Sequence, residues 1–282
     1  NANESFIVPH LATMSLSFAL IPALTLTRSQ DPRQIAQAVA LATSASAVLE
    51  VLIQLPAASR RLKFRPVLQP RDPLLRQTLI VALPAVIATG SSEINQLLQK
   101  NLTSTINEDA ASALVFGYKT YAIYVGLLIL PITVILFSRL GKLSAADDRP
   151  GMLALQRRTL ETMLLVLVPV VLLSMVLHRD IIRVLYQRDR FTAEDTLLTG
   201  SAFLMYIPGL IGYAVKDIFS RFFFSLQDTR TPMWVGVGAL VLNTGLNIIL
   251  VGPMGIAGLA LASTLTLLLS AVALVAILRR KI

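Results

Sequence analysis

Hydrophobic and polar residues follow one another along this chain in long blocks. Each apolar block is about as long as a helix that crosses a bilayer, which needs about 20 apolar residues for a hydrocarbon core of about 30 Å. Lipid cannot satisfy backbone polar groups, so a span of this kind has to be helical. We therefore expect an all-α polytopic membrane protein with about eight transmembrane helices. These predicted helices cover residues 5–27, 34–56, 77–100, 110–138, 153–177, 197–225, 232–251 and 255–278.

Composition supports this interpretation. Of the 282 residues, 55% are hydrophobic and only 15% are charged, with a mean hydropathy of +0.69. The strict alternation of a transmembrane barrel is absent from the sequence, and the chain has no cysteine for disulfides or thiol catalysis. The first residue is Asn1 and no signal-peptide pattern precedes the first span. We therefore expect an internal piece of a longer chain.

The charges in the connections predict an orientation. One set of connections, together with residues 279–281, carries fifteen Lys and Arg residues, mostly in 57–76 and 139–158. The connections on the other side carry six, together with seven acids. The positive-inside rule then places both ends of this segment in the cytoplasm. The net charge of +9 is mainly a sign of topology, and nucleic-acid binding is not favoured because the basic residues lack interleaved aromatics.

One stretch, EINQLLQKN at 93–101, is unusually polar for its place at the end of an apolar span. At 100° per residue its polar side chains share one face of the helix, and its three apolar side chains share the other. A charge in the middle of a bilayer costs roughly 2.5–3.5 kcal/mol. We therefore expect Glu93, Gln96 and Lys100 to line a substrate cavity. The alternative is that the stretch is the outer end of its helix and that Lys100 reaches the interface.

Polar residues also interrupt three other spans. Lys119 lies well inside an apolar span, where it is either a functional cation or a side chain that extends to the interface. Asn243 and Asn247 share a helix face, as a ligand or ion site or as partners in hydrogen bonds between helices. Asp217 and Arg221 have the same i,i+4 spacing, and we favour a structural ion pair near the cytoplasmic end of their helix.

Missing motifs narrow the choice of function. The sequence has no GxxxxGK[ST] phosphate loop. It has two histidines, His10 and His178, and neither has metal-ligand spacing. An enzyme active site is therefore not expected, and a gradient-driven transporter fits better.

Two longer motifs point to a family. They are VLYQRDRFTAEDTLLT at 184–199 and DIFSRFFFSLQDTRTPMWVGVGALVLNTGLN at 217–247, which contains DTRTP at 228–232. With IQLP at 53–56 and GPMGIAGLALAS at 252–263, the chain resembles the MurJ/MviN family of lipid II flippases, in the multidrug/oligosaccharidyl-lipid/polysaccharide exporter superfamily. Within these motifs Asp217, Arg221, Asp228, Arg230 and Pro232 are candidate structural residues.

The resemblance implies a two-lobed exporter-type bundle around a cationic cavity. Residues 1–56 would be the last two helices of the N-terminal lobe, 57–76 a basic cytoplasmic linker, and 77–282 a six-helix C-terminal lobe. It further implies a flippase of the bacterial inner membrane that moves lipid II, a lipid-linked oligosaccharide, across the bilayer by alternating access. The oligomeric state stays open.

The resemblance also assigns residues. Lys119 matches a cavity arginine of the family, with the charge kept and the planar fork lost. A sodium ion is the one cofactor that the family suggests, and its ligands would fall at Gln99, Asn243, Asn247 and Ser263 or Thr264. Family members carry an acid where this chain has Gln99, so we expect weak or no sodium coupling unless Glu93 substitutes for it.

Three other functions stay open. Two are a flippase for another polyprenyl-linked glycan and a sodium-coupled drug exporter of the same superfamily. The third is a membrane scaffold that keeps the fold without transport. A drug exporter would favour acidic and aromatic cavity residues over a lone lysine.

Overall fold

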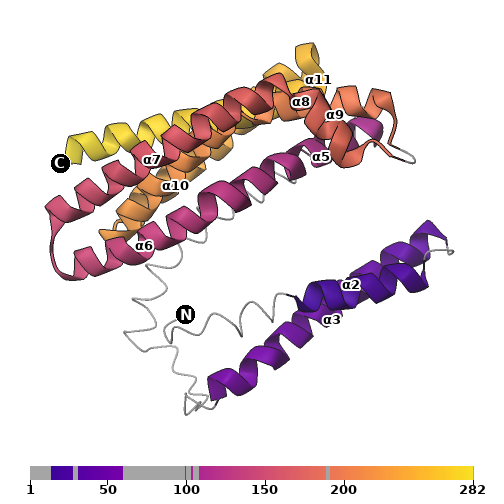
Figure 1. Ribbon diagram of the computed structural model, residues 1–282, viewed down its shortest axis with the longest axis horizontal. Helices are drawn as coiled ribbons and strands as arrows, with labels where there is room; N and C mark the ends of the chain where they lie inside the picture. Colours follow the sequence, from indigo (N-terminus) through magenta and orange to yellow (C-terminus); the bar gives the residue numbers. More distant parts are fainter. Residues whose placement is uncertain are drawn as a thin grey trace. The chain divides into compact units, whose positions relative to one another are not determined.

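The computed structural model describes residues 14–27, 31–59, 99, 103, 108–188 and 191–281. Every regular element within these ranges is a helix (Figure 1). Contacts divide the chain into two compact units, Asn1–Pro70 and Arg71–Ile282. The boundary falls inside the predicted linker 57–76, and the assignment of the units to the two lobes of an exporter remains a prediction.

The first unit contains a helical hairpin of α2 (Ser15–Leu26) and α3 (Pro32–Ser59). The two helices are tied where the buried hydroxyl of Ser15 donates to the backbone carbonyl of Ser46, 3.2 Å away. Larger apolar side chains point away from the hairpin, and Phe18 is 72% exposed. The predicted span 34–56 matches α3, whereas residues 5–13 of the first predicted span lie outside the described residues.

The first continuous described stretch of the second unit is one long helical segment. It runs through α5 (Glu108–Tyr124), a π-helical turn η1 (Val125–Ile129) and α6 (Leu130–Ala145). Pro131 lies in the first turn of α6 and has no N–H to continue the α-helical ladder. The π-helical turn directly before it is the local rearrangement that carries the chain past this missing donor. The segment contains the predicted span 110–138.

Four helices follow. They are α7 (Arg149–Val176), α8 (His178–Tyr186), α9 (Ala193–Tyr206) and α10 (Gly209–Ser225). The predicted span 197–225 lies within one membrane-length segment, Ala193–Ser225, in which a turn at Ile207 and Pro208 separates α9 from α10. The predicted connection 178–195 contains α8, and α9 begins at a capping box in which Thr192 and Asp195 each accept from the other's backbone.

The last element, α11 (Arg230–Lys281), joins two helices at a kink. Gly255 has φ +56° and ψ −132°, a conformation that an L-residue with a side chain rarely adopts. The kink separates the two predicted spans 232–251 and 255–278. Where α10 packs on the second half of α11, Gly212 lets the backbones approach closely, because a Cβ there would lie 2.8 Å from the Leu268 nitrogen.

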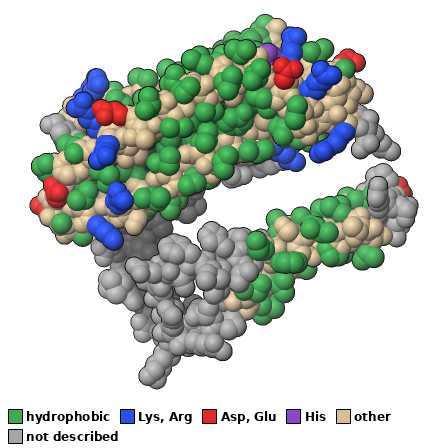
Figure 2. Space-filling view, in the orientation of Figure 1, with side chains coloured by type: hydrophobic (Ala, Val, Ile, Leu, Met, Phe, Trp, Pro, Cys, Tyr) green, Lys and Arg blue, Asp and Glu red, His purple; other side chains and the backbone are tan. Residues whose placement is uncertain are grey.

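The second unit is built to sit in lipid. In Figure 1 its long helices α6, α7, α10 and α11 run lengthwise past one another. In Figure 2 a broad apolar surface lies between two ends that carry the charged side chains. The interior is filled by Phe203, Phe222 and Phe223, while Leu165 and Val176 are 76% and 77% exposed. Large apolar side chains in contact with the surroundings along whole helices are typical of a membrane protein. Among the described residues, four helical segments of this unit and one of the first unit are long and apolar enough to cross a bilayer.

Candidate functional site

The candidate cavity face at 93–101 is described only at Gln99; Glu93, Gln96 and Lys100 lie outside the described residues. Gln99 is 7% exposed and its Nε2 donates to the Ser263 hydroxyl of α11 at 2.7 Å. The Ser263 hydroxyl itself donates to the Leu259 carbonyl at 3.2 Å. The serine proton is thus used within the helix, so Ser263 presents lone pairs and the Gln99 amide has to be the donor.

The same arrangement recurs one turn further along α11, at Thr266. The Thr266 hydroxyl donates to the Ala262 carbonyl at 2.8 Å and accepts from Nδ2 of Asn243 at 3.1 Å. Asn243 then offers its Oδ1 to Nδ2 of Asn247, 2.7 Å away. Both asparagines are at most 1% exposed. The Ala262 carbonyl can only accept a hydrogen bond, so the Thr266 hydroxyl has to donate to it. Thr266 therefore accepts from Asn243, and Asn243 accepts from Asn247.

One acceptor in this network is left over. Oδ1 of Asn247 is buried and has no hydrogen-bond partner among the described residues. Thr264, the other hydroxyl suggested for an ion site, faces elsewhere and donates to the Met205 carbonyl at 2.6 Å. Thr266 is the hydroxyl that sequence reasoning missed; its i,i+3 spacing from Ser263 was the available signal.

These residues do not fit a resident sodium ion. A hard cation prefers several oxygen ligands, with carboxylates among them. Here Gln99, Asn243 and Asn247 all turn N–H groups towards their neighbours, and the Asn243 oxygen accepts from Asn247. Across the described ranges, no cluster of three His, Asp or Glu side chains could hold a metal. The network has the hydrogen bonds of a neutral polar core.

Lys119 lies on α5, eleven residues after Glu108. At 1.5 Å per residue it is roughly 16 Å from that end of the helix, about half the thickness of a hydrocarbon core. Its side chain is exposed, and its Nζ lies 5.5 Å from the centre of the Phe116 ring. None of the four ion pairs among the described residues includes it.

A half-buried polar stripe runs along α10 and is formed by Tyr213, Lys216, Asp217 and Arg221. Nε of Arg221 donates to Oδ2 of Asp217 at 2.8 Å, with both side chains about 20% exposed. Tyr213 is close enough to interact electrostatically with Asp217 and with Tyr118 of α5, the neighbour of Lys119. Sequence reasoning missed Lys216, although a lysine inside an apolar span was itself a signal. It belongs to none of the ion pairs among the described residues.

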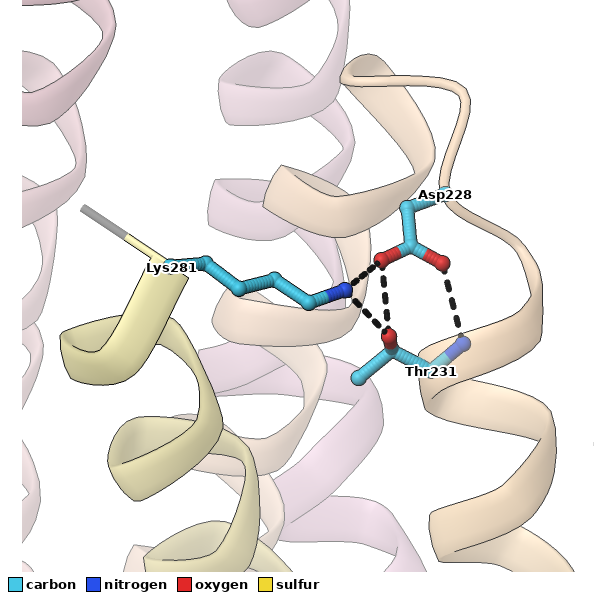
Figure 3. Close-up of polar contacts among 3 residues, drawn as sticks. All are labelled: Asp228, Thr231 and Lys281. Carbon is cyan, nitrogen blue, oxygen red and sulfur yellow. Dashed lines mark hydrogen bonds and ion pairs between the residues drawn. The ribbon is translucent and has the colours of Figure 1, made fainter.

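The DTRTP motif caps α11 (Figure 3). Oδ1 of Asp228 accepts from the Thr231 backbone N–H at 3.0 Å, and Oδ2 accepts from the Thr231 hydroxyl at 2.7 Å. Nζ of Lys281, at the other end of α11, donates to the same Oδ2 at 2.5 Å and to the Thr231 hydroxyl at 3.0 Å. Pro232 is buried in the first turn, where a proline needs no N–H partner, and Arg230 is exposed.

This capping cluster changes the acidity of its carboxylate. Burial alone would raise the pKa of Asp228, but the hydrogen bonds from Lys281 and from the Thr231 side chain and backbone outweigh it. The pKa of Asp228 is therefore held below its ordinary value. These bonds join the two ends of α11 to Asp228 in the α10–α11 connection.

Two solved structures have a fold similar to that of this chain. The chain aligns over 98% of its length with the lipid II flippase MurJ in its inward closed conformation, at 22% identity and a TM-score of 0.79, covering 57% of that chain. It aligns over 96% of its length with an inward-facing multidrug resistance transporter of the MATE family, at 15% identity and a TM-score of 0.77, covering 63% of that chain. The chain therefore has the fold that these two solved structures share.

Sequence comparison gives the family. All of residues 1–282 match the family described as lipid II flippase MurJ. The chain therefore belongs to the MurJ family of membrane transporters, as its motifs predicted.

Curated relatives agree with this assignment. One is the probable lipid II flippase MurJ of Rhizobium meliloti (strain 1021), 27% identical over 93% of this chain and 49% of the relative. Another is the lipid II flippase MurJ of Burkholderia cenocepacia, 24% identical over 93% of this chain and 52% of the relative. The chain spans about half the length of these relatives.

Proposed function

We propose that the full-length protein moves lipid II, the lipid-linked peptidoglycan precursor, across the bacterial inner membrane by alternating access. The observation that carries this proposal is the match of the whole chain to the MurJ family. The curated relatives bear the same name at identities of 22–29%. This chain would supply the end of one lobe and most of the other.

Lys119 is the described residue that best suits this task. The headgroup of lipid II carries a diphosphate, and a fixed cation attracts it more strongly where the dielectric is low. The Lys119 ammonium is exposed, lies deep along α5, and is paired with no carboxylate among the described residues. It is thus available to an anionic substrate in a way that the paired Arg221 is not.

The α10 stripe supports the same proposal. A stripe with a charged pair and a further lysine cannot face lipid without a large cost, so it faces a polar space or other protein. Its Tyr213 interacts electrostatically with Tyr118, which precedes Lys119 on α5. We propose that Lys216 and Tyr213 extend the polar lining beside Lys119 and contact the diphosphate or the sugars.

The function is tested with the full-length protein in a bacterial strain depleted of its own lipid II flippase. We expect it to restore growth and to make lipid II accessible at the outer face of the membrane, measured by an enzyme or toxin that acts on lipid II only from outside. Failure of both readouts in a protein that is expressed and inserted would contradict the proposal. It would favour either a different polyprenyl-linked substrate, which the same assay with other glycans would detect, or a non-transporting scaffold.

A further inference from the structure

A second polar and apolar site lies far along the sequence from Lys119, where α7 begins, α10 ends, and the two ends of α11 come together. A cavity of about 360 Å³ opens there in the second unit. Its apolar wall is formed by Met152, Leu153, Phe222, Phe223, Leu226 and Leu278. Its charged wall is formed by Arg149, Asp228 and Lys281. The volume is at the lower end of the roughly 300–1,000 Å³ of small-molecule sites.

The two cations of the cavity are differently placed. Lys281 is held by Asp228 and Thr231 (Figure 3). Its ammonium also lies 5.6 Å from the centre of the Phe223 ring. Arg149 is held much less, since its side chain is 79% exposed and its Nε lies 3.8 Å from Asp147, which is 92% exposed. An exposed ion pair of this length contributes about 0–1 kcal/mol, so the Arg149 guanidinium is free to turn towards an anion.

The position of the cavity selects its ligand. It lies at the charged end of a membrane-spanning bundle, with a guanidinium and an ammonium beside an apolar wall. Basic pockets between transmembrane helices suit anionic lipid headgroups, because the charges meet the phosphate while the first methylenes of the acyl chains contact apolar side chains. A free phosphate would use the cations and leave the apolar wall unused. Asp228 and Lys281 offset each other's charge, so the net positive charge of the cavity comes from Arg149, while Lys281 still offers N–H groups.

We propose that this cavity binds the headgroup of an anionic phospholipid, with Arg149 as its principal phosphate ligand and Lys281 as the second. The site is separate from the proposed substrate path and does not depend on which glycan the protein moves. A lipid there would join the start of α7 to the latch formed by Asp228 and Lys281.

The test uses native mass spectrometry of the full-length protein, purified and then exposed to equal amounts of phosphatidylglycerol and phosphatidylcholine. We expect retention of one phosphatidylglycerol with roughly tenfold preference, the amount that one charge-assisted contact of about 1.4 kcal/mol supplies. Arg149→Gln should remove most of that preference. Arg280→Gln is the matched control, since Arg280 is exposed at the same end of α11 and does not line the cavity.

Two further arms separate the explanations. Leu153→Trp fills the apolar part with every charge unchanged, and it should also abolish retention. Lys281→Gln removes both a cavity cation and the ion pair with Asp228. Its thermal stability is therefore compared with that of Arg149→Gln, which removes only a cavity cation. Unchanged phosphatidylglycerol retention in Arg149→Gln, or equal retention of phosphatidylcholine, would overturn the proposal. Displacement by inorganic phosphate alone, or by a polyprenyl diphosphate, would also overturn it, by assigning the cavity to a free ion or to the substrate path.

Discussion

Single polar residues decide the chemistry of this membrane bundle, because each has to find a partner or a polar space. Lys119 has an exposed ammonium deep along α5, whereas Gln99, Asn243 and Asn247 are buried and bonded to neighbours. Lys119 is available to a substrate, whereas the three amides form hydrogen bonds within the helix bundle. This contrast leads to one prediction about transport and one about ions.

Replacing Lys119 by alanine should reduce lipid II flipping by about ten- to a hundredfold, because a hydrogen bond to a charged group is worth about 1.5–3 kcal/mol. Lys119→Arg keeps the charge and should retain activity. Arg157→Ala is the control, since that exposed arginine pairs with Glu161 on the outside of α7. The measurement is rescue of a flippase-depleted strain together with the rate of lipid II exposure. Full activity of Lys119→Ala would show that the charge only reaches the interface.

Sodium should leave the stability and activity of the wild-type protein unchanged when it replaces potassium, because the amides around Ser263 and Thr266 turn N–H groups inward. Gln99→Asp puts a buried carboxylate beside Ser263, and its thermal stability should then rise with sodium by about 1.4 kcal/mol for each tenfold excess over Kd. Gln99→Asn is the matched control, because asparagine has the size of the introduced aspartate without its charge. A saturable sodium response in the wild type would contradict this account and direct attention to Glu93.

At the level of elements, helix ends and kinks are set by a few backbone requirements. Pro131 follows a π-helical turn, Pro208 separates α9 from α10, and Gly255 divides α11. The ends of α11 are joined to the α10–α11 connection through Asp228 and Lys281. Substitutions at these kinks and helix ends should lower stability more than substitutions at exposed positions within a helix.

Gly255→Ala should destabilise the protein by about 1–3 kcal/mol, the cost of placing a side chain in a sparsely populated backbone conformation. The space around the Cβ is open, so the cost is one of backbone conformation only. Gly245→Ala is the control, because Gly245 is helical, exposed and equally open; it should be neutral or stabilising by up to about 1 kcal/mol. Thermal unfolding in detergent measures both. Equal behaviour of the two variants would argue against the kink.

Acid should weaken the α11 latch. The folded-state pKa of Asp228 is lowered, so its stabilising contribution is complete above the unfolded value of about 3.9 and is lost as the pH falls through the lower folded pKa. Asp228→Asn keeps the cap and loses the charge, so its stability should be lower than wild type at neutral pH and should lack this acid dependence. Asp147→Asn, at an exposed site, is the control. The measurement is the free energy of unfolding from pH 7 to about pH 3. If it falls in parallel for wild type and Asp228→Asn, the ion pair between Asp228 and Lys281 is not the cause of the acid dependence.

At the scale of the whole molecule, the asymmetry of basic residues predicts orientation. The connections expected in the cytoplasm carry fifteen Lys and Arg residues against six on the other side. The proposed lipid site has its cations, Arg149 and Lys281, at that same end. Orientation is therefore relevant to both the flippase proposal and the lipid proposal.

Single cysteines at Ser59 and Thr192, introduced into a cysteine-free version of the full-length protein, should react oppositely with an impermeant thiol reagent. Thr192 should label in intact cells, and Ser59 only after the membrane is opened. A cysteine at Ala146, in the exposed turn between α6 and α7, should behave like Ser59. Labelling of Ser59 from outside would reverse the proposed orientation.

Sequence by itself was enough to identify the membrane class, the positions of most spans and the family, because apolar length, loop charge and the DTRTP and FTAED motifs are local properties. It also predicted the i,i+4 spacings that place Asp217 beside Arg221 and Asn243 beside Asn247. Only the tertiary structure decided which way the amides point, because that depends on Thr266 and Ser263 donating to carbonyls of their own helix and on α11 approaching Gln99. The same holds for Lys281, which is 53 residues from Asp228 along the chain. Such a contact depends on how α10 and α11 pack, and no local pattern records it.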